Sequence, residues 1–427
     1  MSSSVSARLR YPGAAPRDPA EARRRSVRLR IGAVWFLLFF NTMTYVHGVS
    51  VLDLPSKIGK GLAQGSLPLA ILLALSVNPK LKIRPNVFLS IMSLLILDAS
   101  LTAMQVHHLG TIFRTFRLAE YLFALWLLTP WWGGPDMMLF RWHLRCLYAA
   151  LVSVFVGMLI APGRAFAYQG RLMGVIWPMF PTQVAQYAAV ALGLTVVLWY
   201  ARLVSGRLTL AAVAFDMAIL LLSHTRTALV ALLAGLLVAG LSLFASNGRV
   251  RRFFAAAVAA VTVAFLTVAS FVVTWLARGE SAQGLTSLTG RTNFWALVLD
   301  TPRDRFQEVF GFGLSNASIN GLPIDSNWLS AYMQEGLFGV VVCGAAFVFL
   351  LVTAFFKSTG TRRALSLFLV TYCLIASFTE DSITDVSPYL LNLVVAASLF
   401  MASRPRSYTQ RAPEAALAPE VLEEVAS

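Results

Sequence analysis

The feature that most constrains this chain is a series of long apolar runs, each close to the length that spans a membrane. An α-helix needs about 20 predominantly apolar residues to cross a hydrocarbon core, and these runs lack the period-two alternation of barrel strands. We therefore predict an all-α integral membrane protein of about twelve transmembrane helices. The runs lie at 31–48, 61–77, 86–105, 118–132, 143–161, 182–200, 208–223, 226–245, 253–276, 336–356, 364–378 and 388–402.

Composition agrees with a membrane protein rather than a soluble one. The 427 residues are 57% hydrophobic and 13% charged, whereas soluble proteins carry roughly a quarter charged residues. The formal charge of +15 is spread in short clusters between apolar runs, which argues against a nucleic-acid partner and for membrane lipids as the surroundings. The three cysteines have no ligand-like spacing, so neither a disulfide framework nor a metal site is expected.

The distribution of Lys and Arg predicts the orientation. With twelve spans, 24 of the 35 Lys and Arg residues fall on one side together with both termini, and such an excess is typical of the cytoplasmic side. We predict a multi-pass protein of the inner (plasma) membrane with this organisation: a basic cytoplasmic tail (1–30), nine transmembrane helices (31–276), a large exterior loop before the tenth span (277–335), three further helices (336–402) and a disordered cytoplasmic tail (403–427).

Eleven cationic residues break this rule and fall on the exterior side. Arginine stays charged at any pH and binds phosphate with two parallel hydrogen bonds. A group of exterior arginines therefore predicts an anionic, phosphate-bearing ligand at the outer membrane face. The eleven are Lys57, Lys60, Arg114, Arg117, Arg164, Arg171, Arg226, Arg278, Arg291, Arg303 and Arg305.

Three of these arginines are candidate ligand contacts. Arg226 lies in the polar segment from Ser223 through Thr225 that separates two apolar runs, so a helical hairpin must turn there; the alternative is a snorkelling side chain that anchors a helix end. Arg291 lies in the long loop, where an ordinary loop position is the alternative. Arg171 precedes an aromatic, Pro-containing stretch typical of an interfacial segment, where contact with lipid headgroups is the alternative.

The long loop and the acidic loop after it supply the remaining candidates. Asp325 and Ser326 precede an apolar helical face and have the chemistry of a helix N-cap. A carboxylate at that place among basic neighbours is also able to accept a proton. Glu380 and Asp381 are second candidates for this role, and Gly311 and Gly313 form a Gly-x-Gly segment that we assign to substrate binding.

Together these motifs resemble the O-antigen ligase and O-antigen polymerase-like superfamily of bacterial membrane glycan transferases. The resemblance covers the whole membrane domain. It is carried by Ser-x-Thr-Arg-x-Ala at 223–228, Gly-Arg near a Trp at 290–295, Gly-x-Gly at 311–313 and a Gly-x-x-Gly at 336–339. The family pattern has His-Asn where this chain has Asp325 and Ser326. Either Asp325 replaces the catalytic base, or this branch works without a base from that position.

The resemblance implies a donor glycan on a polyprenyl diphosphate and a glycan or lipid-glycan acceptor. Arg226 and Arg291 would stabilise the leaving diphosphate, with Arg171, Ser223 and Thr225 beside them, and Asp325 would orient or deprotonate the acceptor hydroxyl. No nucleotide, metal or other cofactor is implied. The rival interpretation is a transporter or flippase for an anionic or lipid-linked glycan, which would use the same arginines for binding alone. The lack of visible internal repeats argues against that rival.

Overall fold

The computed structural model describes residues 19–51, 55–134, 136–244, 248–252, 256, 291–314, 318–319, 322–380 and 383–401, and the backbone alone at 19–21, 291–294, 318–319 and 322–323. The described chain is almost entirely helical. Its elements are α1 (Pro19–Asn41), α2 (Ser56–Val77), α3 (Val87–Val106), α4 (Leu109–Leu128), η1 (Thr129–Trp131), α5 (Met138–Ile160), α6 (Pro162–Ala165), α7 (Pro181–Tyr200), α8 (Gly206–Leu222), α9 (Arg226–Phe244), α12 (Arg291–Asp300), α13 (Arg305–Phe310), β1 (Ser318–Ile319), β2 (Leu322–Pro323), α14 (Asn327–Lys357), α15 (Gly360–Ala376) and α16 (Pro388–Phe400).

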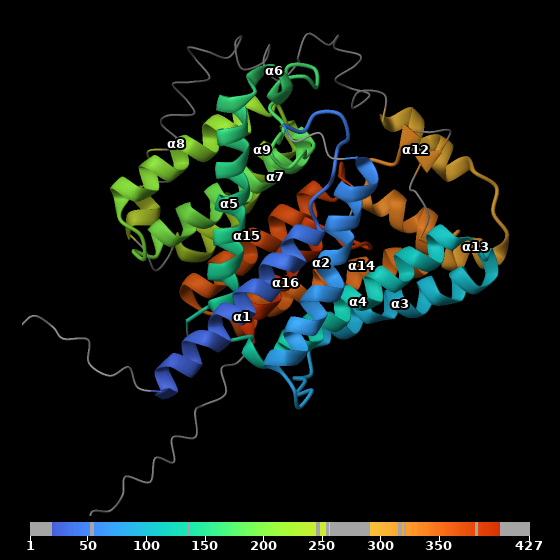
Figure 1. The fold of residues 1–427 in the computed structure, drawn as a ribbon, viewed down its shortest axis with the longest axis horizontal. Helices are drawn as coiled ribbons and strands as arrows, with labels where there is room; N and C mark the ends of the chain where they lie inside the picture. Colours follow the sequence, from blue (N-terminus) through green and yellow to red (C-terminus); the bar gives the residue numbers. More distant parts are fainter. Residues whose placement is uncertain are drawn as a thin grey trace, which may run out of the picture.

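The helices pack as a bundle around three buried ones. Along α7, α15 and α16 most residues are buried, including Val190, Phe368 and Val394 at 0% exposure. Figure 1 shows α15 and α16 in the middle of the bundle, with α8 and α9 on one side and α3, α4 and α13 on the other. The closest pairing joins α9 to α15, where Gly235 leaves room for the ring of Phe368.

The outer helices expose apolar side chains, as a membrane protein requires. Leu72, Leu210 and Phe356 are each more than 60% exposed. Among the described residues, six helices (α2, α3, α5, α7, α9 and α14) are long and apolar enough to cross a membrane. The prediction of a multi-pass α-helical membrane protein is therefore confirmed. α8, α15 and α16 are shorter, and α1 and α4 carry several charged residues.

A helix lies over every predicted apolar run that the structure describes. The ninth run, 253–276, falls outside the described residues except for Ala256, as does most of each predicted tail. Two boundaries were wrong. The first helix begins at Pro19 and not at 31, because Ala and Arg, which favour helix, extend it at its start. It ends at Asn41 and not at 48, because residues 46 and 51 form backbone hydrogen bonds with the segment 175–178 instead.

The second wrong boundary concerns the long loop and the tenth span. α14 begins at Asn327, nine residues before the predicted start of the span at 336. At Gly336 its backbone turns to φ 62 and ψ −158, so α14 consists of a short helix, a break and a long apolar helix. Hydropathy located the second part only, because the first part contains polar residues. The predicted cap at Asp325 and Ser326 had indicated the first part, and Ser326 does hold the N-cap position.

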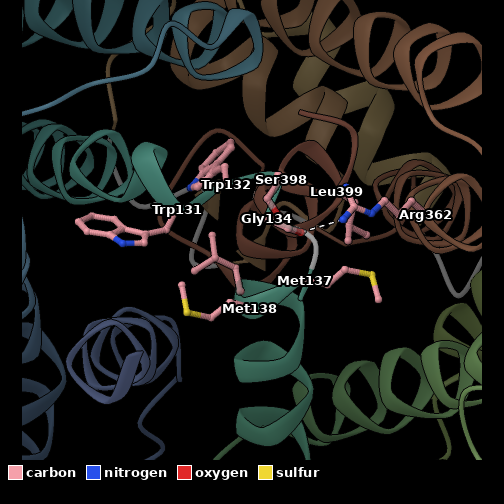
Figure 2. A pocket seen from close by; sticks show the side chains of 10 residues that line it. Trp131, Trp132, Gly134, Met137, Met138, Arg362, Ser398 and Leu399 are labelled. Carbon is pink, nitrogen blue, oxygen red and sulfur yellow. Dashed lines mark hydrogen bonds between the residues drawn. The ribbon is translucent and has the colours of Figure 1, made fainter. Parts of the chain in front are cut away.

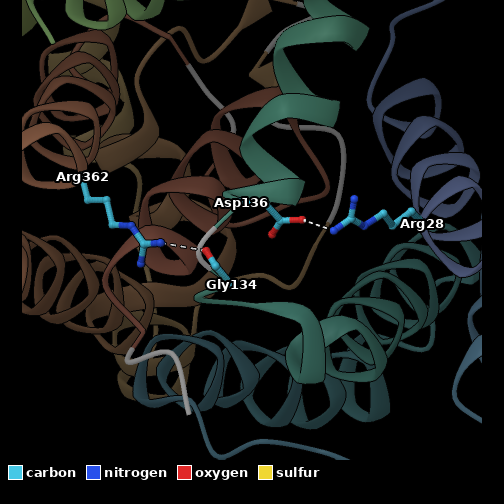
Figure 3. A network of polar contacts seen from close by, with 4 residues as sticks. All are labelled: Arg28, Gly134, Asp136 and Arg362. Carbon is cyan, nitrogen blue, oxygen red and sulfur yellow. Dashed lines mark hydrogen bonds and ion pairs between the residues drawn. The ribbon is translucent and has the colours of Figure 1, made fainter. Parts of the chain in front are cut away.

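Several helix ends meet around the connection between α4 and α5, which we call the basic end. They are the starts of α1, α3, α5 and α15 and the ends of α2, α4 and α16. There, Arg28 of α1 forms an ion pair of 3.1 Å with Asp136, and Arg362 of α15 donates to the carbonyl of Gly134 at 2.8 Å. Figure 3 shows both contacts. Gly133 N–H donates to Ser398 of α16 at 3.0 Å.

The basic end carries predicted cytoplasmic cations such as Lys80, Arg141 and Arg363. A small hollow at this end lies between Trp131, Met138, Arg362 and Leu399 (Figure 2). It has room for about one water molecule. The predicted site residues Arg171, Arg226 and Asp325 lie at the opposite end, the loop end, where α1, α5, α8 and α15 finish and α2, α7, α9, α14 and α16 begin.

Candidate functional site

The predicted turn at residues 223–225 is present at the loop end. α8 ends at Leu222 and α9 begins at Arg226, and His224 between them adopts a left-handed φ of 49. The hydroxyl of Ser223 donates to the carbonyl of Leu220 at 2.7 Å and is fully buried. The turn therefore places Arg226, half-buried, at the first position of α9, whereas Ser223 serves the local fold.

Arg171, on a second segment, donates two hydrogen bonds to this turn. Its Nε donates to the carbonyl of Ser223 at 3.0 Å, and its Nη2 donates to Oγ1 of Thr225 at 2.9 Å. Burial lowers the pKa of Arg171, and the nearby groups Tyr168 and Glu380 act in the opposite direction. The guanidinium stays charged at any physiological pH. The structure thus brings Arg171, Ser223 and Thr225 together.

The end of α15 joins the same turn. The hydroxyls of Thr227, in the first turn of α9, and Thr379, just after α15, share a hydrogen bond of 2.7 Å. Glu380 follows Thr379, is half-buried and lies near enough to Arg171 for its charge to act on that guanidinium. Asp381, the other predicted acid of this loop, lies outside the described residues.

Hydrogen bonds join the start of α14 to the loop after α15, the acidic loop that contains Glu380. Asn327 is fully buried; its N–H donates to Ser377 at 2.9 Å, and its Oδ1 accepts from the N–H of Ile383 at 2.7 Å. Ser326 holds the N-cap position with an extended backbone but makes no capping hydrogen bond with its side chain. The half-buried Asp325 precedes it, so a second carboxylate lies beside the loop that contains Glu380.

The Gly-x-Gly segment has a packing role in the structure. Phe312 and Gly313 donate their N–H groups to the carbonyls of Met333 and Gln334 at 2.9 and 2.8 Å, next to the break in α14. A Cβ on Gly311 would overlap the backbone of Gln334, and one on Gly336 would overlap the backbone of Val309. The two glycine motifs therefore allow two chain segments to cross in backbone contact.

Arg303 fixes the same crossing from the side. Its guanidinium lies 3.9 Å from the ring centre of Tyr332 and donates to the carbonyls of Tyr332 and Val298 at 3.2 and 3.0 Å. Arg291 begins α12, and its side chain lies outside the described part of the chain.

Sequence reasoning missed several residues that hold the site together. Thr227, Ser377, Thr379 and Asn327 were not singled out, because each is a common polar residue whose partner is more than 45 positions away. Only Asn327 had a local signal, since it follows Asp325 and Ser326 at a helix start.

Chemically, the loop end gathers two arginines on adjoining segments, Arg171 and Arg226, and two carboxylates, Glu380 and Asp325. Such a set can hold an anion through guanidinium groups and accept a proton from a nearby hydroxyl. No family model matches the sequence, and a search of curated proteins finds no match either. The fold and the apolar helices define the class: a multi-pass α-helical membrane protein.

Proposed function

We propose that the chain is a membrane glycan transferase of the O-antigen ligase or polysaccharide polymerase type. It moves a glycan from a polyprenyl-diphosphate carrier to the hydroxyl of a glycan or lipid-glycan acceptor. The observation that carries the proposal is the meeting, at one end of the bundle, of the Arg226 turn, Arg171, Glu380 and the helix start beside Asp325. These residues come from four separate segments. The resemblance implies roles for Arg226 and Asp325, and the sequence also singled out Arg171 and Glu380.

In the proposed reaction an acceptor hydroxyl attacks the anomeric carbon of the donor sugar. The new glycosidic C–O bond forms as the bond from that carbon to the diphosphate breaks, and polyprenyl diphosphate leaves. Asp325 takes the proton of the hydroxyl. Charge on the leaving diphosphate rises in the transition state, so Arg226 and Arg291 contribute most if they are fixed in place before the reaction.

We further propose a twelve-span topology in the inner membrane, with the loop end outside and both termini in the cytoplasm. The placement of the basic connections supports it: Lys80, Arg141 and Arg363 belong to connections or helix starts of the basic end, while the irregular segments gather at the loop end. A lipid-linked glycan presented in the outer leaflet would meet the site without crossing the membrane.

The test is sugar transfer by the purified, reconstituted protein, supplied with a polyprenyl-diphosphate-linked glycan and candidate acceptors. We expect wild type to release polyprenyl diphosphate and to form a longer or newly linked glycan. Arg226→Ala and Arg291→Ala should each lower kcat by about 10²–10³-fold, and Asp325→Ala by about 10²–10⁴-fold. Arg164→Ala is the control, because Arg164 lies at the same end and donates to the carbonyl of Ser50.

Each outcome has a distinct meaning. An active Asp325→Ala variant would remove the base assignment alone. A wild type that transfers no sugar but moves labelled lipid-linked glycan between leaflets would replace the transferase with the flippase. The ladder of product sizes separates a polymerase from a ligase.

A further inference from the structure

We propose that Arg171 is a positioning residue that sets the place of Arg226, rather than a group that touches the diphosphate. This inference rests on the proposed function for its kinetic consequences but not for its structural ones.

The segment that carries Arg171 is a tight hairpin. Tyr168 and Arg171 pair as a β-bridge, and the N–H of Arg171 donates to the carbonyl of Tyr168 at 2.9 Å. The two residues between them, Gln169 and Gly170, have φ of 52 and 68. Two left-handed residues in succession define the compact turn that joins twisted strands, so the backbone beneath Arg171 has little freedom.

The residues after the hairpin attach it to the neighbouring helices. Leu172 N–H donates to the carbonyl of Leu222, the last residue of α8, and Met173 N–H donates to Ala165, both at 2.9 Å. Leu172 and Met173 are fully buried. The hairpin is therefore anchored to the same helix end from which the turn departs, and Arg171 reaches across a short, fixed distance.

The side chain of Arg171 forms its two hydrogen bonds with the turn at 223–225. Nε and Nη2 both point to it, one to a backbone carbonyl at Ser223 and one to the hydroxyl of Thr225. Thr225 in turn donates to the carbonyl of Ser223 at 3.2 Å, so its oxygen is oriented to accept from Arg171. This two-pronged arrangement needs the planar guanidinium, and a lysine cannot reproduce it.

The contacts of Arg171 with the turn affect the position of Arg226, the residue that follows the turn. The turn has only three residues between α8 and α9, one of them with a left-handed backbone. Without Arg171 the hydroxyl of Thr225 loses its donor and the carbonyl of Ser223 keeps only the one from Thr225. The turn then holds the start of α9 less firmly. A displacement of about 1 Å at a reacting centre can cost about 10²-fold in rate.

The experiment compares Arg171→Ala, Arg171→Lys, Thr225→Val and Thr225→Ser in the transfer assay, with Arg164→Ala as the matched arginine control. We expect Arg171→Lys to lose as much kcat as Arg171→Ala, about 10–10²-fold, with KM for the donor little changed. Thr225→Val should show a smaller loss and Thr225→Ser almost none. The double variant Arg171→Ala with Thr225→Val should lose no more than Arg171→Ala alone, because both act through one turn.

Amide hydrogen exchange of peptides covering 222–229 gives a readout that needs no enzymatic activity. Exchange there should rise in Arg171→Ala, Arg171→Lys and Thr225→Val, and stay at the wild-type rate in Arg164→Ala and Thr225→Ser. The inference is overturned if Arg171→Lys keeps both activity and protection, or if the two substitutions are additive, since a direct contact with the diphosphate would give those results. If wild type transfers no sugar, the proposed function fails, and the exchange data still decide whether Arg171 holds the turn.

Discussion

Asn327 shows how one buried side chain can define the geometry of the loop end. It is fully buried, and through its N–H and its Oδ1 it joins the start of α14 to both sides of the acidic loop, at Ser377 and Ile383. Trp328 adds a third link, from its indole N–H to the hydroxyl of Ser377 at 3.0 Å. The distance between Asp325 and Glu380 therefore depends on these few hydrogen bonds.

We expect Asn327→Ala to destabilise the protein by about 1–3 kcal/mol, because it leaves the N–H of Ile383 buried without its acceptor. The measurement is thermal unfolding in detergent, followed by the loss of monodisperse protein. Ser76→Ala is the control, since Ser76 is exposed and its hydroxyl bonds only within its own helix. An unchanged unfolding temperature for Asn327→Ala would mean that water replaces the amide oxygen.

At the level of single residues, the sequence singled out charged residues such as Arg171 and Arg226, but it did not indicate which groups each side chain contacts. The positive charge of Arg171 and Arg226 was noticeable because the predicted topology puts both residues on the exterior side, where Lys and Arg are unusual. The hydrogen bonds of Ser223 back to its own helix and of Arg171 to Thr225 depend on a turn geometry that residue types do not specify.

The break in α14 is the element on which the loop end depends most. It lets the segment around Gly311 pass in backbone contact and gives the carbonyls of Met333 and Gln334 new donors from Phe312 and Gly313. Irregular backbone near a membrane survives only where such groups are satisfied by protein. Hydropathy could not locate this break, because it marks where apolar residues begin and not where a helix is interrupted.

Substituting Gly336→Ala should sharply reduce the yield of folded protein. Its φ of 62 and ψ of −158 lie in a region that is essentially restricted to glycine and costs about 1–3 kcal/mol otherwise, and a Cβ there overlaps the backbone of Val309. Gly344→Ala, in the same helix with open space around its Cβ, should be neutral or more stable by about 0.5–1 kcal/mol. Size-exclusion profiles of the two variants decide the matter; equal yields would show that the crossing relaxes without penalty.

For the molecule as a whole, apolar runs and charge clusters were enough to predict a multi-pass helical bundle, because both follow from the solvent and not from particular partners. The packing order was not predictable in the same way. That α7, α15 and α16 form the buried centre follows from shape, such as the fit of Phe368 against Gly193 and Gly235, and similar apolar runs elsewhere in the chain face lipid instead.

The two ends of the bundle make the proposed orientation testable with single cysteines. The chain has three cysteines, Cys146, Cys343 and Cys373, and all are buried, so they can stay in place. Gly163 lies exposed at the loop end with open space around its Cβ, and Lys80 lies exposed at the basic end. A membrane-impermeant thiol reagent should therefore report on these two positions alone.

In intact cells whose outer envelope is permeable to the reagent, we expect Gly163→Cys to be labelled and Lys80→Cys to be labelled only after the inner membrane is disrupted. The reason is the excess of Lys and Arg at the basic end, which is retained on the cytoplasmic side. The reverse pattern would place the candidate site in the cytoplasm, where a glycan presented in the outer leaflet cannot reach Arg226, and the transferase would have to act on a donor in the inner leaflet. Equal labelling of both positions in intact cells would contradict the assignment of the two ends to opposite faces of a membrane.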